Sequence, residues 1–271
     1  MLGGGREAEV FVVDDAKVLK LYRPGFGGHR AEAATLRSLD GRNVAPKLLD
    51  VVDCDGRTGL VLERLTGPDM LTHVQRRPWH VHRIGRWLAE AHLEIHRVVA
   101  PAELPDLREV LHARIPDAAL PQPLLDFSSR VLDRLPDGDR LCHGDYHPGN
   151  VLLRPDRTAV IDWGAATRGV SEADYARTLL LLRWADPLPG TPLPQRALIA
   201  GGRSLLAATY SRVYRRGSPP LRSAKSWLVV HTAARLSEGI SAERDLLIRR
   251  LESAWRQWRR HAGEAGPAPG R

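Results

Sequence analysis

Three polar side chains in the middle of the chain have the types and spacing of a site for a divalent cation and a reacting hydroxyl. Asp145 and Asn150 fall within the segment HGDYHPGN, and Asp162 follows in IDWG. Between Asn150 and Asp162, residues 151–153 and 159–161 are apolar and predict the two short strands of a β-hairpin. The hairpin would therefore hold two oxygen-bearing side chains close to a third in the preceding loop.

This hairpin predicts a metal site at its open end. With the turn centred on Asp156, Asn150 faces Asp162 across the strands, with Cβ atoms roughly 5 Å apart on one face. Magnesium is typically held by one or two carboxylates together with substrate phosphates, so this pair suits it. Asp145, in its tight loop, is placed to orient a hydroxyl and take its proton. A turn-capping role is the alternative for any one of these residues taken alone.

A lysine and a glutamate in the first 40 residues offer a contact for phosphate. Lys20 lies within a predicted strand, residues 18–22, where a lysine is unfavourable without a partner. Glu32 shares a helical stripe with Leu36 and Leu39, so we expect it to face the same sheet. Buried opposite charges need one another. We therefore expect Lys20 to pair with Glu32 and still reach a phosphate; two unrelated surface charges are the alternative.

Glycines precede the first predicted strand. Gly3, Gly4 and Gly5 would let backbone amides approach phosphate oxygens. The cluster Gly25–Gly28, before the helix that carries Glu32, is the less favoured alternative, because a β-hairpin covers a nucleotide better than a strand-to-helix connection. The sequence contains no GxxxxGK[ST] motif, which excludes a phosphate loop of that kind.

The elements that must position these residues divide the chain into two parts. Residues 1–65 are rich in predicted strands with one helix, and residues 66–271 are mainly helical. We expect an α+β fold with a small antiparallel sheet lobe, a larger helical lobe and a crevice between them. The tail after about residue 262 is predicted to be disordered. The predicted helices of the second part span residues 80–99, 105–117, 123–135, 173–184, 193–215, 221–237 and 241–261.

Composition excludes several classes of protein. The 271 residues are 43% apolar, enough for a core, and the two cysteines cannot form a disulfide scaffold or a Cys-rich zinc site. Without a signal peptide or a long apolar run, we expect a cytoplasmic protein with no membrane partner. The net charge of +8 comes from the region after residue 200, away from the motifs, so no nucleic-acid partner is expected.

HGDYHPGN and IDWG together resemble the aminoglycoside phosphotransferase and choline kinase-like family, small-molecule kinases related in fold to protein kinases. The resemblance extends over nearly the whole chain. GREAEVF is similar to the family's glycine loop, VLKLY to its lysine strand, AEAATLRSL to its glutamate helix and LVLERLTGP to its hinge. It implies a protein-kinase-like two-lobed fold and transfer of the γ-phosphoryl group of ATP, or GTP, with Mg²⁺, to a hydroxyl of a small molecule. That acceptor would be an aminoglycoside, a sugar, an amino alcohol or a related metabolite.

The resemblance also implies a role for each candidate residue. Asp145 would be the catalytic base, and Asn150 and Asp162 would bind magnesium. Lys20 would contact the nucleotide phosphates, oriented by Glu32. Further implied residues are Gly4 and Gly5 in the lid, Glu63 and Leu65 at the adenine, and Asp174 as a brace for the catalytic loop.

Two features of the sequence bear on the acceptor and on activity. The basic region after residue 200 disfavours a polycationic acceptor, although acidic residues at 172, 174, 186 and 238 could supply local negative charge. Only MLGGG precedes the glycine turn, where the family has a full first strand, so we expect the lid strand to be nearly missing. A catalytically silent nucleotide-binding module is therefore the alternative function. His92 and His96 lack evident further metal ligands, so we expect hydrogen-bonded structural roles for them.

Overall fold

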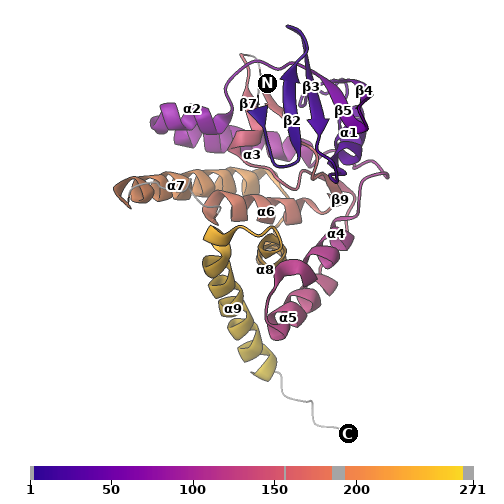
Figure 1. The fold of residues 1–271 in the computed structure, drawn as a ribbon. Helices are drawn as coiled ribbons and strands as arrows, with labels where there is room; N and C mark the ends of the chain where they lie inside the picture. Colours follow the sequence, from indigo (N-terminus) through magenta and orange to yellow (C-terminus); the bar gives the residue numbers. More distant parts are fainter. Residues whose placement is uncertain (1–2, 156, 185–192, 265–271) are drawn as a thin grey trace.

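The computed structural model describes residues 3–155, 157–184 and 193–264, and the chain begins with a five-stranded antiparallel sheet (Figure 1). The strand order is β1-β2-β3-β5-β4. Three hairpins, β1–β2, β2–β3 and β4–β5, and the connection from β3 to β4, which carries helix α1 (Gly28–Ser38), build this sheet. The strands are β1 (Gly3–Gly4), β2 (Ala8–Val12), β3 (Lys17–Tyr22), β4 (Leu48–Cys54) and β5 (Arg57–Glu63).

Helix α1 packs on the sheet through the stripe that its sequence predicts. Leu36 and Leu39 are buried, and so is Glu32 on the same stripe. On the sheet, Lys20 lies between Val10 of β2 and Leu60 of β5 in the hydrogen-bonded register. This register turns Lys20 toward α1, as alternation along the strand requires.

The rest of the chain is mainly helical, with two short β-pairs, β6 with β9 and β7 with β8. Figure 1 shows these helices on one side of the five-stranded sheet. The helices are α2 (Met70–Arg76), α3 (Val81–Ile95), α4 (Leu107–Arg114), α5 (Gln122–Asp133), α6 (Ser171–Trp184), α7 (Leu193–Gly217), α8 (Ala224–Leu236) and α9 (Ser241–Glu264). The strands are β6 (Arg140–Cys142), β7 (Val151–Leu153), β8 (Thr158–Val160) and β9 (Thr167–Gly169), and short 3₁₀ helices are η1 (Pro78–His80), η2 (Pro116–Ala118) and η3 (Pro148–Asn150).

One hydrophobic core joins the sheet to the helices. Tyr22, Leu36 and Leu60 from the sheet part belong to the same buried cluster as Ile84 of α3 and Trp163. A second cluster lies between α4, α5, α6, α8 and α9. The predicted α+β architecture, with a small antiparallel sheet lobe and a larger helical lobe, is confirmed. The predicted boundary at residue 65 lies between the end of β5 and the start of α2.

Two predictions concern the ends of the chain and membranes. Helix α9 continues to Glu264, and residues 265–271 of the predicted disordered tail lie outside the described residues. Within the described part of the chain, every helix is too short or too polar to cross a membrane.

Candidate functional site

Asp145 lies in the loop His143–Asn150, which connects β6 to β7. The loop turns at Gly144, where φ is +79° and a Cβ atom would lie 2.3 Å from the carbonyl oxygen of Ala165. Glycine is required there both by the backbone angle and by the close approach. The next amide, that of Asp145, donates to Nδ1 of His143 at 3.2 Å. The turn at Gly144 therefore fixes where the Asp145 side chain emerges.

Gly144→Ala should destabilise the protein and abolish activity, because it combines a strained φ with overlap against a backbone oxygen. We expect a loss of about 2–5 kcal/mol in the free energy of unfolding. Urea unfolding measures this loss. Gly25→Ala is the matched control, since Gly25 also has a positive φ, +85°, but nothing lies within 4 Å of its Cβ position. Equal losses in the two variants would show that the contact with Ala165 is unimportant.

The Asp145 carboxylate is partly exposed and ionised. Its side chain is 39% exposed, and His147 Nε2 lies 3.6 Å from Oδ2. Burial alone would raise the pKa of Asp145, but the hydrogen bond and charge of His147, with the charges of Arg177 and His143, hold it well below its usual range. At neutral pH this carboxylate can accept a hydrogen bond from a hydroxyl group.

Asn150 is tied to Asp145 and not to Asp162. Its Nδ2 donates to the carbonyl oxygen of Asp145 at 2.9 Å and approaches Asp145 Oδ2 at 3.5 Å. The predicted register of the hairpin was wrong by one residue. Val151 pairs with Val160, so Asn150 stands opposite Ile161, whose amide donates to the Asn150 carbonyl at 2.9 Å.

Asp162 follows the hairpin in an unusual conformation. Its φ is +66°, in the left-handed region that a non-glycine residue rarely adopts, and such residues are concentrated at functional sites. The side chain is 55% exposed, and its Oδ1 accepts from Lys20 Nζ at 2.8 Å. The conformation therefore directs a carboxylate toward the sheet lobe and leaves it accessible.

Lys20 joins the two lobes, and its predicted partner is correct. Nζ lies 2.6 Å from Oε2 of the buried Glu32 and also bonds Asp162. Glu32 accepts two further hydrogen bonds, from the Tyr22 hydroxyl and from the Trp163 amide. Burial would lower the pKa of Lys20, but the charges of Glu32 and Asp162 outweigh it and raise that pKa. Lys20 is therefore held as a cation between a buried and an accessible carboxylate.

The predicted lid is a short hairpin of β1 and β2. Gly4 of β1 pairs with Glu9 of β2, and the Gly5 amide donates to the Ala8 carbonyl at 2.9 Å. The first strand is thus present but only two residues long, as the N-terminal sequence predicts. Among the described residues, no atom lies within 4 Å of a Cβ position on Gly4.

The predicted adenine contact lies where β5 ends. Glu63 is fixed by its amide, which donates to the Lys47 carbonyl at 2.9 Å, and by Arg154, whose NH1 lies 3.8 Å from the Glu63 carboxylate. Two residues later, the Leu65 amide has no hydrogen-bond partner among the residues that the structure describes. This backbone donor is therefore left without a partner within the described part of the protein.

Asp174 lies in the first turn of α6 and anchors the loop that carries Asp145. Its carboxylate accepts from the amides of His143 at 2.6 Å and Gly144 at 3.0 Å. His92 and His96 also bond it through their Nε2 atoms, at 3.0 and 3.2 Å. Burial alone would raise the pKa of Asp174, but these hydrogen bonds hold it well below its usual range. The bracing contact predicted for Asp174 is present.

The sequence suggested no further ligand beside His92 and His96, but the structure brings Asp174 to both of them. With Asp174 they form a buried group whose ligand atoms lie within 4.8 Å of one another, as a metal site would require. Each ring nitrogen already has a partner, however, since the Nδ1 atoms bond Tyr210 and Tyr214 at 2.7 and 2.6 Å. In the sequence, the i, i+4 spacing of the two histidines indicates that they share one face of a helix. It does not indicate Asp174 as their partner, because that residue lies about 80 positions later in the chain.

Two buried histidines make stability depend on pH. Burial lowers the pKa of both His92 and His231 to about 3, from an ordinary value of 6.5. Between these values the unfolded chain binds protons that the folded chain does not, so the free energy of unfolding falls as pH falls. We expect a lower urea midpoint at pH 5 than at pH 7. A midpoint that is equal or higher at pH 5 would contradict this account.

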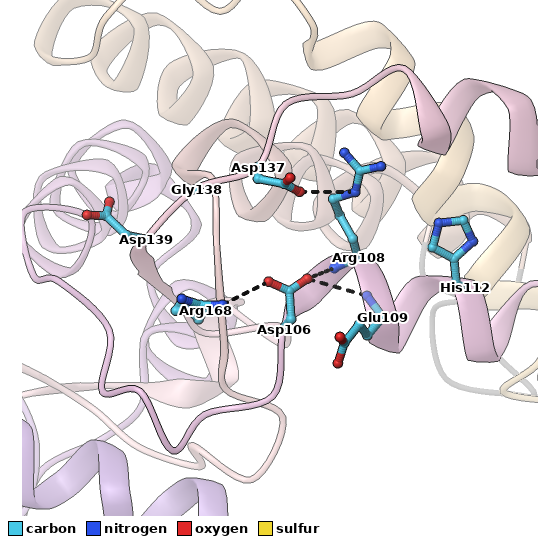
Figure 2. A pocket seen from close by; sticks show the side chains of 8 residues that line it. All are labelled: Asp106, Arg108, Glu109, His112, Asp137, Gly138, Asp139 and Arg168. Atoms are coloured by element: carbon cyan, nitrogen blue, oxygen red, sulfur yellow. Dashed lines mark hydrogen bonds and ion pairs between the residues drawn. The ribbon is translucent and has the colours of Figure 1, made fainter.

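A separate pocket of about 660 Å³ lies between α4, the segment 137–139 and β9. Figure 2 shows Asp137 facing Arg108 and Asp106 facing Arg168. Arg108 Nε lies 3.1 Å from the Asp137 carboxylate, and Arg168 lies 3.4 Å from that of Asp106. None of the eight lining residues is a predicted site residue. The candidate site is therefore the group of charged side chains formed by Lys20, Glu32 and Asp162, with Asp145 in the preceding loop.

Comparison with known proteins identifies the family of the chain. The profile of the Phosphotransferase enzyme family matches residues 2–215. No curated protein matches the chain. A thermostable mutant of the aminoglycoside phosphotransferase APH(4)-Ia, solved with AMP-PNP and hygromycin B, superposes with a TM-score of 0.64 at 18% identity, covering 94% of this chain and 92% of that one.

Two further solved structures share the fold. A choline/ethanolamine kinase family protein from Mesorhizobium loti has a TM-score of 0.63 at 18% identity, covering 92% of this chain and 85% of that one. An aminoglycoside-3'-phosphotransferase of type VIII has a TM-score of 0.58 at 20% identity, covering 85% and 94%. Since the family profile spans most of the chain and the fold agrees, the protein belongs to the Phosphotransferase enzyme family and is a small-molecule kinase.

Proposed function

We propose that this enzyme transfers the γ-phosphoryl group of ATP, or GTP, to a hydroxyl group of a small molecule. The observation that carries the proposal is the link made by Lys20, which bonds Glu32 of the sheet lobe and Asp162 of the helical lobe beside the loop of Asp145. The nucleotide complexes of similar structures, with AMP-PNP in one and ADP in another, support the choice of donor.

The side chains present fit a magnesium ion. Asp162 offers an accessible carboxylate. Asn150 donates a hydrogen bond to Asp145 through its Nδ2, so its Oδ1 is the atom that could bind a metal ion. Both are hard oxygen donors of the kind that magnesium takes, and a bound ion would neutralise charge on the phosphates. We assign Asn150 and Asp162 to the metal, and Lys20, oriented by Glu32, to the phosphates.

The remaining roles concern the nucleotide base and the acceptor. We assign the backbone of Glu63 and Leu65 to adenine, and Gly4 and Gly5 to the lid over the phosphates. Asp145 would align the acceptor hydroxyl and take its proton, so that catalysis is largely positioning and charge neutralisation.

The choice of acceptor depends on acidic side chains that could bind a polycation, and several of them are already paired within the protein. Glu172 Oε1 accepts from the Ser223 amide at 2.6 Å, and Asp174 is enclosed by its own hydrogen bonds. Glu238 bonds both Arg177 and Arg235. Position 186 lies outside the described residues. Among the acids that are described, these pairings favour a neutral or anionic hydroxyl compound over an aminoglycoside.

The alternative function is a nucleotide-binding module without activity. An ATP-consumption screen over aminoglycosides, amino alcohols, sugars and macrolides separates the two functions. Acceptor-dependent ATP consumption would support the kinase. Magnesium-dependent stabilisation by ATP, with no consumption in the presence of any acceptor or of water, would favour the silent module.

A further inference from the structure

Arg177 is a buried arginine of α6 that the chemistry described so far does not use. Its side chain is only 7% exposed. Its Nε donates to the carbonyl oxygen of Gly144 at 3.1 Å, and its Nη2 lies 2.7 Å from Oε1 of Glu238. The planar guanidinium therefore joins the loop that carries Asp145 to the connection between α8 and α9.

The bond to Gly144 fixes the peptide group that precedes Asp145. That group consists of the Gly144 carbonyl, held by Arg177, and the Asp145 amide, which donates to Nδ1 of His143 at 3.2 Å. The amide of Gly144 donates to Asp174 at 3.0 Å. Asp174 and Arg177 lie three residues apart on α6, so they project from one face of the helix. One helix therefore holds Gly144 at both its amide and its carbonyl, and with them the point from which the Asp145 side chain emerges.

Glu238 keeps the Arg177 guanidinium in this position. It lies in the connection between α8 and α9, and its Oε2 bonds Arg235. Arg235 is held in turn by both carboxylate oxygens of Glu243, at 2.8 and 2.9 Å. The carbonyl oxygen of Glu238 also accepts from Arg6, in the turn between β1 and β2, at 3.4 Å. Arg177 is therefore paired with a carboxylate whose own position is fixed, as a buried charge requires.

We propose that Arg177 is a positioning residue for Asp145, held in place by Glu238. The inference rests on the proposed function, in which Asp145 aligns the acceptor hydroxyl. Because Arg177 fixes the peptide group before Asp145, the carboxylate meets the hydroxyl in one geometry. A displacement of about 1 Å at a reacting group can cost on the order of 10²-fold in rate. The role affects the transfer step and not nucleotide binding, since the contacts assigned to the nucleotide belong to other residues.

Arg177→Lys tests this role without removing the charge. Lysine keeps a cation beside Glu238 but lacks the planar fork that reaches a carbonyl and a carboxylate at once. We expect kcat for ATP consumption to fall about 10- to 100-fold, while the affinity for AMP-PNP stays within about twofold of the wild type. Turnover is measured with hygromycin B, ethanolamine, glucose and erythromycin as acceptors and with water alone. AMP-PNP binding is measured by calorimetry in excess Mg²⁺.

Arg235→Lys is the matched control. Arg235 is buried to nearly the same degree, with 9% of its side chain exposed, and it pairs with the same Glu238. Within the described part of the chain, its hydrogen bonds go to Glu238 and Glu243 and not to the loop of Asp145. We expect the two variants to lose similar stability, measured as urea midpoints, and only Arg177→Lys to lose kcat.

The outcomes separate the positioning role from the proposed function. An unchanged kcat in Arg177→Lys, an equal loss of kcat in Arg235→Lys, or a loss of AMP-PNP affinity as large as the loss of kcat would overturn the positioning role alone. If the wild-type protein consumes ATP with none of these acceptors and not with water, the proposed function fails and the inference fails with it.

Discussion

Asp145→Ala should lose phosphoryl transfer while it still binds nucleotide. A positioned acid–base group typically contributes about 10²- to 10⁴-fold to the rate, so we expect kcat to fall by that factor. The affinity for AMP-PNP should stay near that of the wild type, because the contacts assigned to the nucleotide belong to Lys20, Asn150 and Asp162. Acceptor-dependent ATP consumption and calorimetric titration measure the two quantities separately.

His147→Ala controls for a disturbed loop. His147 lies 3.6 Å from the Asp145 carboxylate, and its Nδ1 accepts from the Gly149 amide. We expect a smaller loss of kcat than for Asp145→Ala, because the carboxylate itself remains. Normal turnover in Asp145→Ala would refute the assignment of the base, whatever the result for His147.

Lys20→Met should lose both nucleotide binding and stability. Glu32 is 1% exposed in its side chain, and removal of Lys20 would leave it as a buried carboxylate without its cation. Breaking a buried ion pair from one side typically costs about 3–5 kcal/mol. Urea unfolding should show a loss of that order, and AMP-PNP binding should fall below detection.

The double variant Lys20→Met with Glu32→Gln separates the two losses. Glutamine can keep the hydrogen bonds of Tyr22 and Trp163 without a buried charge, so stability should return toward that of the wild type. Nucleotide binding should not return, because the cation for the phosphates is still missing. A double variant that remains as unstable as Lys20→Met would show that the buried charge was not the cause.

Much of the site could be predicted because its residues carry strong local signals. A lysine in mid-strand and a glutamate on an apolar helical stripe are each unfavourable alone, so their sequence positions suffice to pair Lys20 with Glu32. The sheet and the longer helices follow from their hydrophobic periods. These are the places where local pattern and tertiary packing agree.

The register of the β7–β8 hairpin could not be predicted from local pattern. A turn centred on Asp156 would pair Asn150 with Asp162, but Leu153 instead pairs with Thr158. The Arg154 amide donates to the Arg157 carbonyl at 2.9 Å. The strands are therefore joined by four residues, 154–157, whereas the predicted register requires five. A slip of one residue moves every side chain to the other face, and three-residue strands carry too little pattern to prevent it.

Other parts of the site depend on contacts distant in sequence. The meeting of His92 and His96 with Asp174 joins α3 to α6, and no local pattern specifies it. The close approach of Gly28 to Gly164, where a Cβ atom on Gly28 would lie 3.0 Å from the Gly164 carbonyl oxygen, also joins segments that are distant in sequence. The positive φ of Asp162 is likewise imposed by its surroundings, since a non-glycine residue keeps such a conformation only where the packing around it holds it there.

The most direct test of the account is the affinity for AMP-PNP in Mg²⁺, measured by calorimetry on the wild type, Asp162→Asn and Asp145→Ala. The account predicts that the wild type binds, that Asp162→Asn binds at least about tenfold more weakly because a metal ligand and a partner of Lys20 are lost, and that Asp145→Ala binds as the wild type does. A wild-type protein that does not bind AMP-PNP, or an Asp162→Asn variant with unchanged affinity, would contradict a metal–nucleotide site between the lobes.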